Sequence, residues 1–123
     1  MKVLVDTSVW IRGLSNHEPW RRRLEHLLAG RDVRAHELIY GELLIGDKSG
    51  RTGSLADYEL LPKAASVTHA EVVQLVSNGQ LHGLGIGWID AHLLAAALVD
   101  KLKLWTADPH LATLAKEFGV AYS

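Results

Sequence analysis

Short apolar runs alternate with longer amphipathic stretches along this chain of 123 residues. The first run covers residues 3–5 and leads directly into Asp6, and another covers residues 102–106 near the C-terminus. Short apolar runs bounded by polar residues are typical of buried strands. The same pattern predicts further short strands at 33–35, 65–67 and 120–122.

The stretches between these runs carry apolar residues at three- and four-residue spacing, which predicts helices. We expect helices at 8–14, 36–45, 55–61, 70–81, 88–101 and 109–118, and one that is capped by Ser15 or Asn16 and ends at Gly30. Pro19 falls in the first turn of that capped helix, a position where proline is favoured. Strands that alternate with helices predict an α/β sandwich built on a parallel sheet.

The composition narrows the class of protein without naming it. The chain is 48% hydrophobic and 22% charged, its net charge is −1, and it has no cysteine. The length suits a single domain over residues 1–123. No disulfide or thiolate metal site is available, and no apolar stretch approaches the roughly 20 residues of a membrane span. We expect a soluble cytoplasmic protein with no membrane contact.

Four acidic residues stand out by their positions. Asp6 and Asp108 each follow a predicted strand, and ligands of parallel sheets bind outside the carboxyl ends of the strands. Glu42 and Asp90 lie inside apolar helices, where a carboxylate is costly unless it is paired or binds a cation. We call these four residues the acidic quartet.

Four carboxylates that meet at one sheet edge repel one another and raise the pKa of at least one of them. A divalent cation removes that repulsion. Oxygen ligands without cysteine suit a hard ion such as Mg²⁺ or Mn²⁺. Such an ion binds phosphate oxygens and activates water, so the pattern points to phosphodiester hydrolysis.

The four acids lie in the segments VLVDTSVWI, HELIYGELLIG, WIDAHLLAAAL and LWTADPHL, at intervals of 36, 48 and 18 positions. In this order and spacing the segments resemble the PIN-domain ribonucleases, and more narrowly the VapC-type toxins of bacterial type II toxin–antitoxin systems. The resemblance extends over nearly the whole chain. It implies a three-layer sandwich with a small parallel sheet flanked by helices, and Mg²⁺-dependent cleavage of RNA.

The resemblance also implies roles for individual residues. Asp6 and Asp90 match the most direct metal ligands, while Asp108 and Glu42 complete the shell directly or through water and orient the attacking water. Ser8 or Thr7 matches a hydroxyl beside the first acid, and Thr106 matches one before the last.

The resemblance implies partners as well. These are an RNA substrate, a second copy of the chain in a homodimer, and a cognate antitoxin whose C-terminal segment lies in the active-site groove. Complexes with the antitoxin would be heterotetramers or larger. The slightly acidic net charge differs from that of many nucleases, so RNA contact is expected from local cations. The candidates are Arg21, Arg22, Arg23, Lys48 and Arg51.

Each feature also has a purely structural interpretation. Asp6 and Asp108 are ordinary helix caps, Asp90 is a first-turn acid favoured by the helix dipole, and Glu42 is a paired acid at the core edge. The tryptophans are interpreted as core or edge aromatics, with Trp10 and Trp20 as alternative partner anchors. A non-catalytic PIN-like module that binds RNA or protein is therefore the alternative function.

Overall fold

A parallel sheet of three short strands forms the centre of the molecule. The structure is a computed structural model that describes residues 1–46 and 52–123. Strands β1 (Val3–Val5), β2 (Val33–Arg34) and β3 (Lys103–Trp105) lie in the order β2-β1-β3. Val3 pairs with Val33 on one side and with Lys103 on the other. The central strand β1 therefore carries its carboxyl end, and Asp6 after it, to the middle of the sheet edge.

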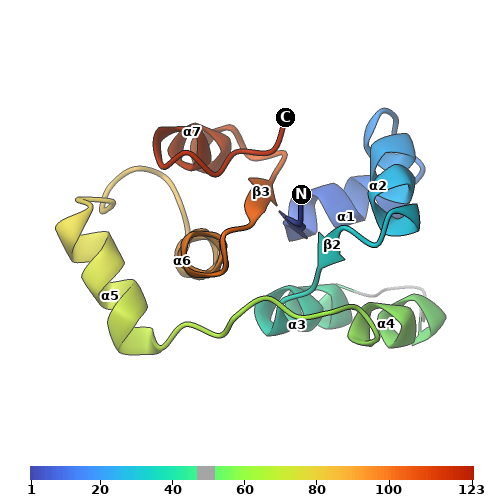
Figure 1. The fold of residues 1–123 in the computed structure, drawn as a ribbon, viewed down its shortest axis with the longest axis horizontal. Coiled ribbons are helices and arrows are strands. Elements are labelled where there is room, and N and C mark those ends of the chain that lie inside the picture. Colours follow the sequence, from blue (N-terminus) through green and yellow to red (C-terminus); the bar gives the residue numbers. More distant parts are fainter. Residues whose placement is uncertain (47–51) are drawn as a thin grey trace.

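Helices lie on both sides of this sheet (Figure 1). Helix α6 lies between α5 and the sheet, whereas α1 and α2 pack together on the side away from α5. This arrangement confirms the predicted α/β class with a small parallel sheet flanked by helices. The helices are α1 (Thr7–Leu14), α2 (Trp20–Ala29), α3 (Glu37–Ile45), α4 (Thr52–Glu59), α5 (His69–Asn78), α6 (Trp88–Asp100) and α7 (Pro109–Glu117).

The core explains why two elements are apolar on every side. All three residues of β1 have an exposed fraction of 0%, because β1 is flanked by strands and covered by helices. Helix α6 buries a continuous run at 93–97 and contacts both β3 and α5. Its alanines are small enough to let both neighbours approach closely. No helix in the part of the chain that the structure describes has the length and apolar character to cross a membrane.

The predicted cap of the second helix is wrong. Neither Ser15 nor Asn16 caps α2, which begins at Trp20 with Pro19 in the N-cap position. The intervening residues still follow the end of α1, since the N–H groups of Ser15 and His17 donate to carbonyl oxygens of α1. The Glu18 carboxylate accepts a hydrogen bond from the Arg22 N–H at 3.0 Å and so satisfies one N-terminal donor of α2.

Two predicted strands are not strands. Residues 65–67 have no ladder partner within the described chain; the Ala65 N–H donates instead to the Asp100 carboxylate at 3.0 Å, and the nearby bridge joins Ala35 to Lys63. The C-terminal run 120–122 forms one parallel bridge between Ala121 and Leu104. The run 120–122 does pair with β3, since the Leu104 N–H donates to the Val120 carbonyl and the Tyr122 N–H donates to the Leu104 carbonyl, but the pairing is too short to form a strand.

Candidate active site

Asp6 occupies the most constrained position of the site. It follows β1 and is only 6% exposed. Its N–H donates to the Trp105 carbonyl at 2.9 Å, which continues the pairing of β1 with β3. Its Oδ1 accepts a hydrogen bond from the Thr7 N–H at 2.8 Å and thereby caps α1. The sheet and the helix together fix this carboxylate.

Two hydroxyl groups hold the other oxygen of Asp6. Oδ2 accepts hydrogen bonds from Ser8 Oγ at 2.8 Å and from Thr106 Oγ1 at 2.7 Å. Ser8 Oγ in turn accepts from the Ala107 N–H at 3.0 Å, and Thr106 Oγ1 accepts from the Asp108 N–H at 3.1 Å. These bonds link the ends of β1 and β3, and they place both predicted hydroxyls beside Asp6.

Glu42 is linked to the region around Asp6 by a hydrogen bond from Thr7. Thr7 Oγ1 donates to Glu42 Oε1 at 2.6 Å, joining the first turn of α1 to α3. The sequence left open whether Ser8 or Thr7 is the hydroxyl beside the first acid. In the structure both hydroxyls bind carboxylates, Ser8 that of Asp6 and Thr7 that of Glu42.

Asp90 is half-buried in the first turn of α6, and its Oδ2 accepts a hydrogen bond from the Gly87 N–H at 3.1 Å. Burial, followed by the negative charges of Asp6, Asp108 and Glu42, raises the pKa of Asp90, while the Gly87 N–H acts in the opposite direction. The other three members of the quartet thus all influence this carboxyl. These charges are therefore close enough to disfavour ionisation of Asp90.

Asp108 is both a cap and a member of this charged group. Its Oδ1 accepts a hydrogen bond from the His110 N–H at 2.8 Å, and so it is the N-cap of α7. The His110 imidazole Nδ1 lies 3.4 Å from the same oxygen. The structural interpretations of Asp6 and Asp108 as caps are therefore correct, and the acids combine capping with a position at the charged edge.

The donor set suits a hard divalent cation by its chemistry, because it consists of carboxylate oxygens with hydroxyls beside them. Burial, and after it the negative charges of the other three acids, raises the pKa of Asp90, and a bound cation would offset the repulsion among these charges. Within residues 1–46 and 52–123, however, no three Asp, Glu or His side chains are already gathered into a group that could hold a metal. The residues fit the ion in type, and their side chains are spread apart.

The predicted arginine cluster is largely engaged within the chain. Arg21 pairs with Glu18 at 2.9 Å and with Glu25 at 3.0 Å. The guanidinium of Arg23 lies over the Trp105 and Tyr122 rings, 5.0 and 5.1 Å from their centroids. The Arg22 side chain is 82% exposed. Lys48 and Arg51 lie outside the described residues.

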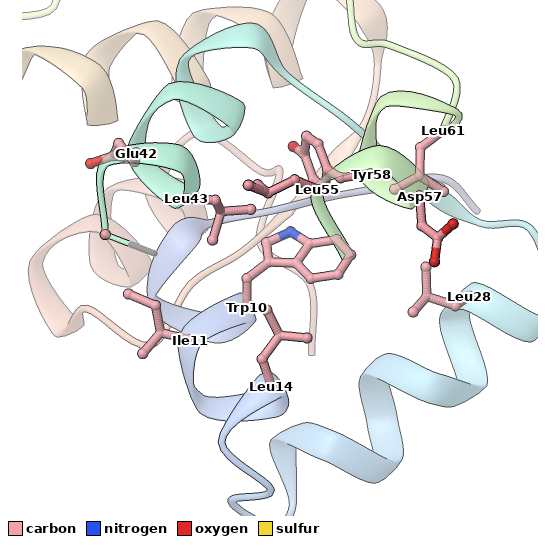
Figure 2. Close-up of a pocket in the computed structure, with 11 residues that line it drawn as sticks. Trp10, Ile11, Leu14, Leu28, Glu42, Leu43, Leu55, Asp57, Tyr58 and Leu61 are labelled. Carbon is pink, nitrogen blue, oxygen red and sulfur yellow. The ribbon is translucent and has the colours of Figure 1, made fainter. Parts of the chain in front are cut away.

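An apolar cavity of about 260 Å³ opens next to Glu42, between α1, α2, α3 and α4 (Figure 2). Trp10 lies at its centre, and Glu42 lies at one end with its carboxylate directed away from Trp10. The Trp10 ring meets that of Tyr58 edge to face at 5.2 Å, which makes Trp10 a core aromatic. Its buried Nε1 has no hydrogen-bond partner among the described residues. The cavity wall therefore combines apolar side chains with one unsatisfied donor.

Two contributors to the site have no side-chain signature in the sequence. The Gly87 N–H holds Asp90, and the Ala107 N–H orients Ser8. Both are backbone donors at turns beside the acids. The glycine immediately before an apolar helix was the only indication of the first, and nothing in the sequence marks the second.

Comparison with known proteins is consistent with this geometry. Residues 3–117 match the sequence profile of the PIN domain. The chain is 40% identical over 120 residues to Ribonuclease VapC32, found in two strains of Mycobacterium tuberculosis, with 97% of this chain and 94% of that protein covered. The crystal structure of PAE2754 from Pyrobaculum aerophilum superposes with a TM-score of 0.57 at 17% identity, over 97% of this chain and 90% of that one, and so supports the fold alone.

Proposed function

Because this chain belongs to the PIN-domain family, among its VapC-type ribonuclease toxins, we propose that it is a Mg²⁺-dependent endoribonuclease whose active site is the acidic quartet. The observation that carries the proposal is Asp6, a buried carboxylate at the end of the central strand, held by hydroxyls from two chain segments. A buried charge fixed in this way is expensive to maintain for a cap alone.

The proposed roles follow from how each carboxylate is held. Asp6 and Asp90 are the most direct metal ligands, with Asp108 as a third. The hydroxyls of Ser8 and Thr106 fix one oxygen of Asp6 and leave further lone pairs for a cation. When bound, Mg²⁺, or Mn²⁺ in its place, supplies positive charge to the phosphate and favours ionisation of a water.

The proposed reaction is hydrolysis of an RNA phosphodiester by in-line attack of water. The bond from phosphorus to the 3′ oxygen breaks, the water oxygen stays on phosphorus, and the products carry a 5′-phosphate and a 3′-hydroxyl. Glu42 and Asp108 accept hydrogen bonds from the attacking water and orient it. Thr7 fixes one oxygen of Glu42, which leaves the other oxygen for this task.

The partner in this proposal is a cognate antitoxin, and its docking surface is the cavity around Trp10. Apolar side chains of α1 border this cavity, including Ile11 at 54% and Leu14 at 36% exposure. A partner segment with one large apolar side chain would fill this space and bury the exposed apolar surface around it. We also propose that the toxin is a homodimer, with heterotetramers or larger assemblies formed with the antitoxin.

The test of the proposed activity is cleavage of a pool of small RNAs in the presence of Mg²⁺ or Mn²⁺, with wild type and Asp6→Asn prepared identically. Asparagine keeps the size of the side chain and an acceptor for the Thr7 N–H, so we expect the cap of α1 to survive and the protein to fold, even though the amide nitrogen cannot accept the hydrogen bonds that Ser8 and Thr106 donate to Oδ2. We expect discrete fragments from wild type, none with chelator, and at least a 100-fold loss in the variant. An unchanged rate in Asp6→Asn would refute the quartet assignment.

Asp32→Asn is the matched control. Asp32 lies just before β2, at the opposite end of the sheet, and pairs with exposed Lys2 at 3.1 Å. The same chemical change there should leave cleavage at the wild-type rate. If neither wild type nor control cleaves, metal titration by calorimetry distinguishes the alternative, because a module that only binds RNA or protein would take up no Mg²⁺ at the quartet.

The docking surface is tested with Leu14→Asp, which introduces a charge at the mouth of the cavity. We expect this variant to lose co-purification with its cognate antitoxin, because the partner would have to bury an unpaired carboxylate. Val73→Asp is the control, since Val73 is similarly exposed at 43% but lies on α5. Equal loss in both variants would contradict the assignment of this cavity.

A further inference from the structure

Trp88 is a large aromatic side chain held at the surface between two imidazole rings. It is 43% exposed, whereas Trp10 and Trp105 are 6% and 5% exposed. The His69 ring centroid lies 5.1 Å from that of Trp88 at an interplanar angle of 54°, and the His92 centroid lies 5.1 Å away at 85°. We call Trp88, His69 and His92 the Trp88 platform.

The platform lies at the same edge of the sheet as the acidic quartet because of how α6 is connected. Helix α6 leads at its C-terminal end into β3, which runs parallel to β1. The first turn of α6 is therefore at the sheet edge where β1 ends in Asp6. Trp88 and Asp90 both lie in that turn, about 3 Å apart along the helix axis. Side chains two positions apart differ by about 200° around the helix axis, so Trp88 lies at the same sheet edge as Asp90 but on the other side of the first turn, against His69 of α5.

The geometry of the platform leaves the indole available. Although both imidazoles contact it, the Trp88 side chain remains 43% exposed. The two histidines limit the orientations of the indole. Exposing part of a tryptophan costs hydrophobic free energy, and a rigid exposed aromatic beside a charged site is typical of a binding surface.

We propose that the Trp88 platform stacks an unpaired base of the RNA next to the phosphodiester at the quartet, and thereby makes cleavage selective for single-stranded segments. The proposal rests on the ribonuclease function proposed above. Proteins recognise unpaired bases mainly by stacking them on aromatic side chains, whereas a base inside a duplex has no free face. The platform therefore determines which segments of an RNA present a phosphodiester to the acids.

The test is equilibrium binding of a 12-nucleotide single-stranded RNA of mixed sequence, and of the same strand in a duplex, in buffer with chelator so that no cleavage occurs. We expect Trp88→Ala to bind the single strand about tenfold more weakly. Trp88→Phe keeps an aromatic face and should recover most of the affinity. Binding of the duplex should be equal in all three proteins.

Val99→Ala is the matched control, because Val99 is an exposed apolar residue at the far end of the same helix. It should bind both RNAs as wild type does. Wild-type affinity in Trp88→Ala would overturn the platform, and so would an equal loss for single strand and duplex. A smaller assembly in solution for Trp88→Ala than for wild type would also overturn the platform, since Trp88 would then be a contact between subunits.

Cleavage measured in parallel separates this proposal from the one on which it rests. If wild type cleaves with Mg²⁺ and Trp88→Ala matches its affinity and rate, the platform fails and the ribonuclease stands. If wild type binds the single strand through Trp88 but does not cleave in any metal, the platform stands and the ribonuclease fails. A raised KM with little change in kcat is expected of Trp88→Ala, because the indole contacts substrate away from the reacting atoms.

Discussion

The two sides of the charged edge are held in different ways. On one side, Asp6 receives hydrogen bonds from the backbone of α1 and from hydroxyls on two segments about 100 residues apart. On the other side, the one hydrogen bond that Asp90 receives from the described residues comes from Gly87, which precedes its own helix. Asp6 is buried and cross-linked, while Asp90 is half-buried and locally held.

This difference means that Asp6 is already held in place before a ligand binds, whereas the ionisation of Asp90 depends on its surroundings. The Asp6 corner depends on long-range contacts that exist once the sheet has formed, so its carboxylate is fixed before any ligand arrives. Burial, and after it the charges of its neighbours, raises the pKa of Asp90. We infer that Asp6 defines where a cation binds and that Asp90 completes the site by responding to it, consistent with the spread arrangement of the acids.

The largest change in stability is expected for Thr106→Val, which removes one of the hydrogen bonds that hold Asp6. The variant keeps the shape of the side chain but removes the donor to Asp6 Oδ2 and the acceptor for the Asp108 N–H. We expect a loss of about 2 kcal/mol in the free energy of unfolding, measured with denaturant, because one lost bond involves a charged group. Cleavage should fall about tenfold, since the carboxylate is less well oriented.

Thr113→Val is the control for that change. The Thr113 hydroxyl donates to the Pro109 carbonyl at 2.9 Å within α7 and is exposed. Such a bond competes with helix hydrogen bonding and adds little stability. Equal destabilisation by the two variants would show that the Asp6 corner is no more constrained than an ordinary helix surface.

A smaller change in stability, of opposite sign, is expected at Asp90. Asp90→Asn removes one charge from the group, so without metal the melting temperature should rise by about 3 °C at neutral pH. A clear decrease would show that Asp90 contributes a structural bond that outweighs repulsion. Glu117→Gln on exposed α7 should leave the melting temperature close to that of wild type.

The pH dependence of the same comparison has a definite sign. The pKa of Asp90 is raised in the folded state from its ordinary value of 3.8, so the folded protein holds a proton where the unfolded chain has lost it. The contribution of Asp90 to stability is therefore fully present below pH 3.8 and is lost as the pH rises through the higher folded pKa. The stabilising effect of Asp90→Asn should appear as the pH rises through the folded pKa of Asp90. It should be absent below pH 3.8.

The smallest effect, a change in the salt dependence of RNA binding, is expected at Arg22 on α2. Its side chain is mostly exposed and lies 3.9 Å from Glu18, whereas Arg21 has two shorter ion pairs. If Arg22 contacts a phosphate, Arg22→Gln should reduce the slope of log affinity against log salt concentration by about one, as measured with single-stranded RNA. Arg21→Gln is the comparison, and a slope equal to wild type in Arg22→Gln would remove this residue from the RNA surface.

Much of this fold was predictable because local and global preferences agree. The apolar run 3–5, the alanine-rich helix around Asp90 and the Pro109 start of α7 each have one reasonable structure, and each was predicted within a residue or two. Residues 65–67 satisfied the pattern of a strand, but the Ala65 N–H found a side-chain acceptor instead. The cap of α2 failed because the backbone after α1 was already hydrogen-bonded to that helix.

The sequence allowed candidate acids to be chosen, but it did not specify how they are connected. The four acids were chosen from position and from resemblance, and their shared role as a site stays a prediction. That Thr7 binds Glu42 while Ser8 binds Asp6 depends on where α3 packs against α1, which no local pattern specifies. The exposure of Trp88 likewise depends on the packing of α5, so the sequence indicated only a core or edge aromatic.

Asp6 and Asp108 each start a helix as well as contributing charge. A substitution that removes either side chain entirely therefore removes a cap, at about 1 kcal/mol, together with the charge. Among inactive variants that still accumulate as folded protein, those at Asp6 and Asp108 should consequently be enriched in asparagine, because other replacements also remove the cap. For anyone who needs a folded but silent form of this chain to crystallise with RNA, the amide is the replacement that removes the charge and preserves the cap.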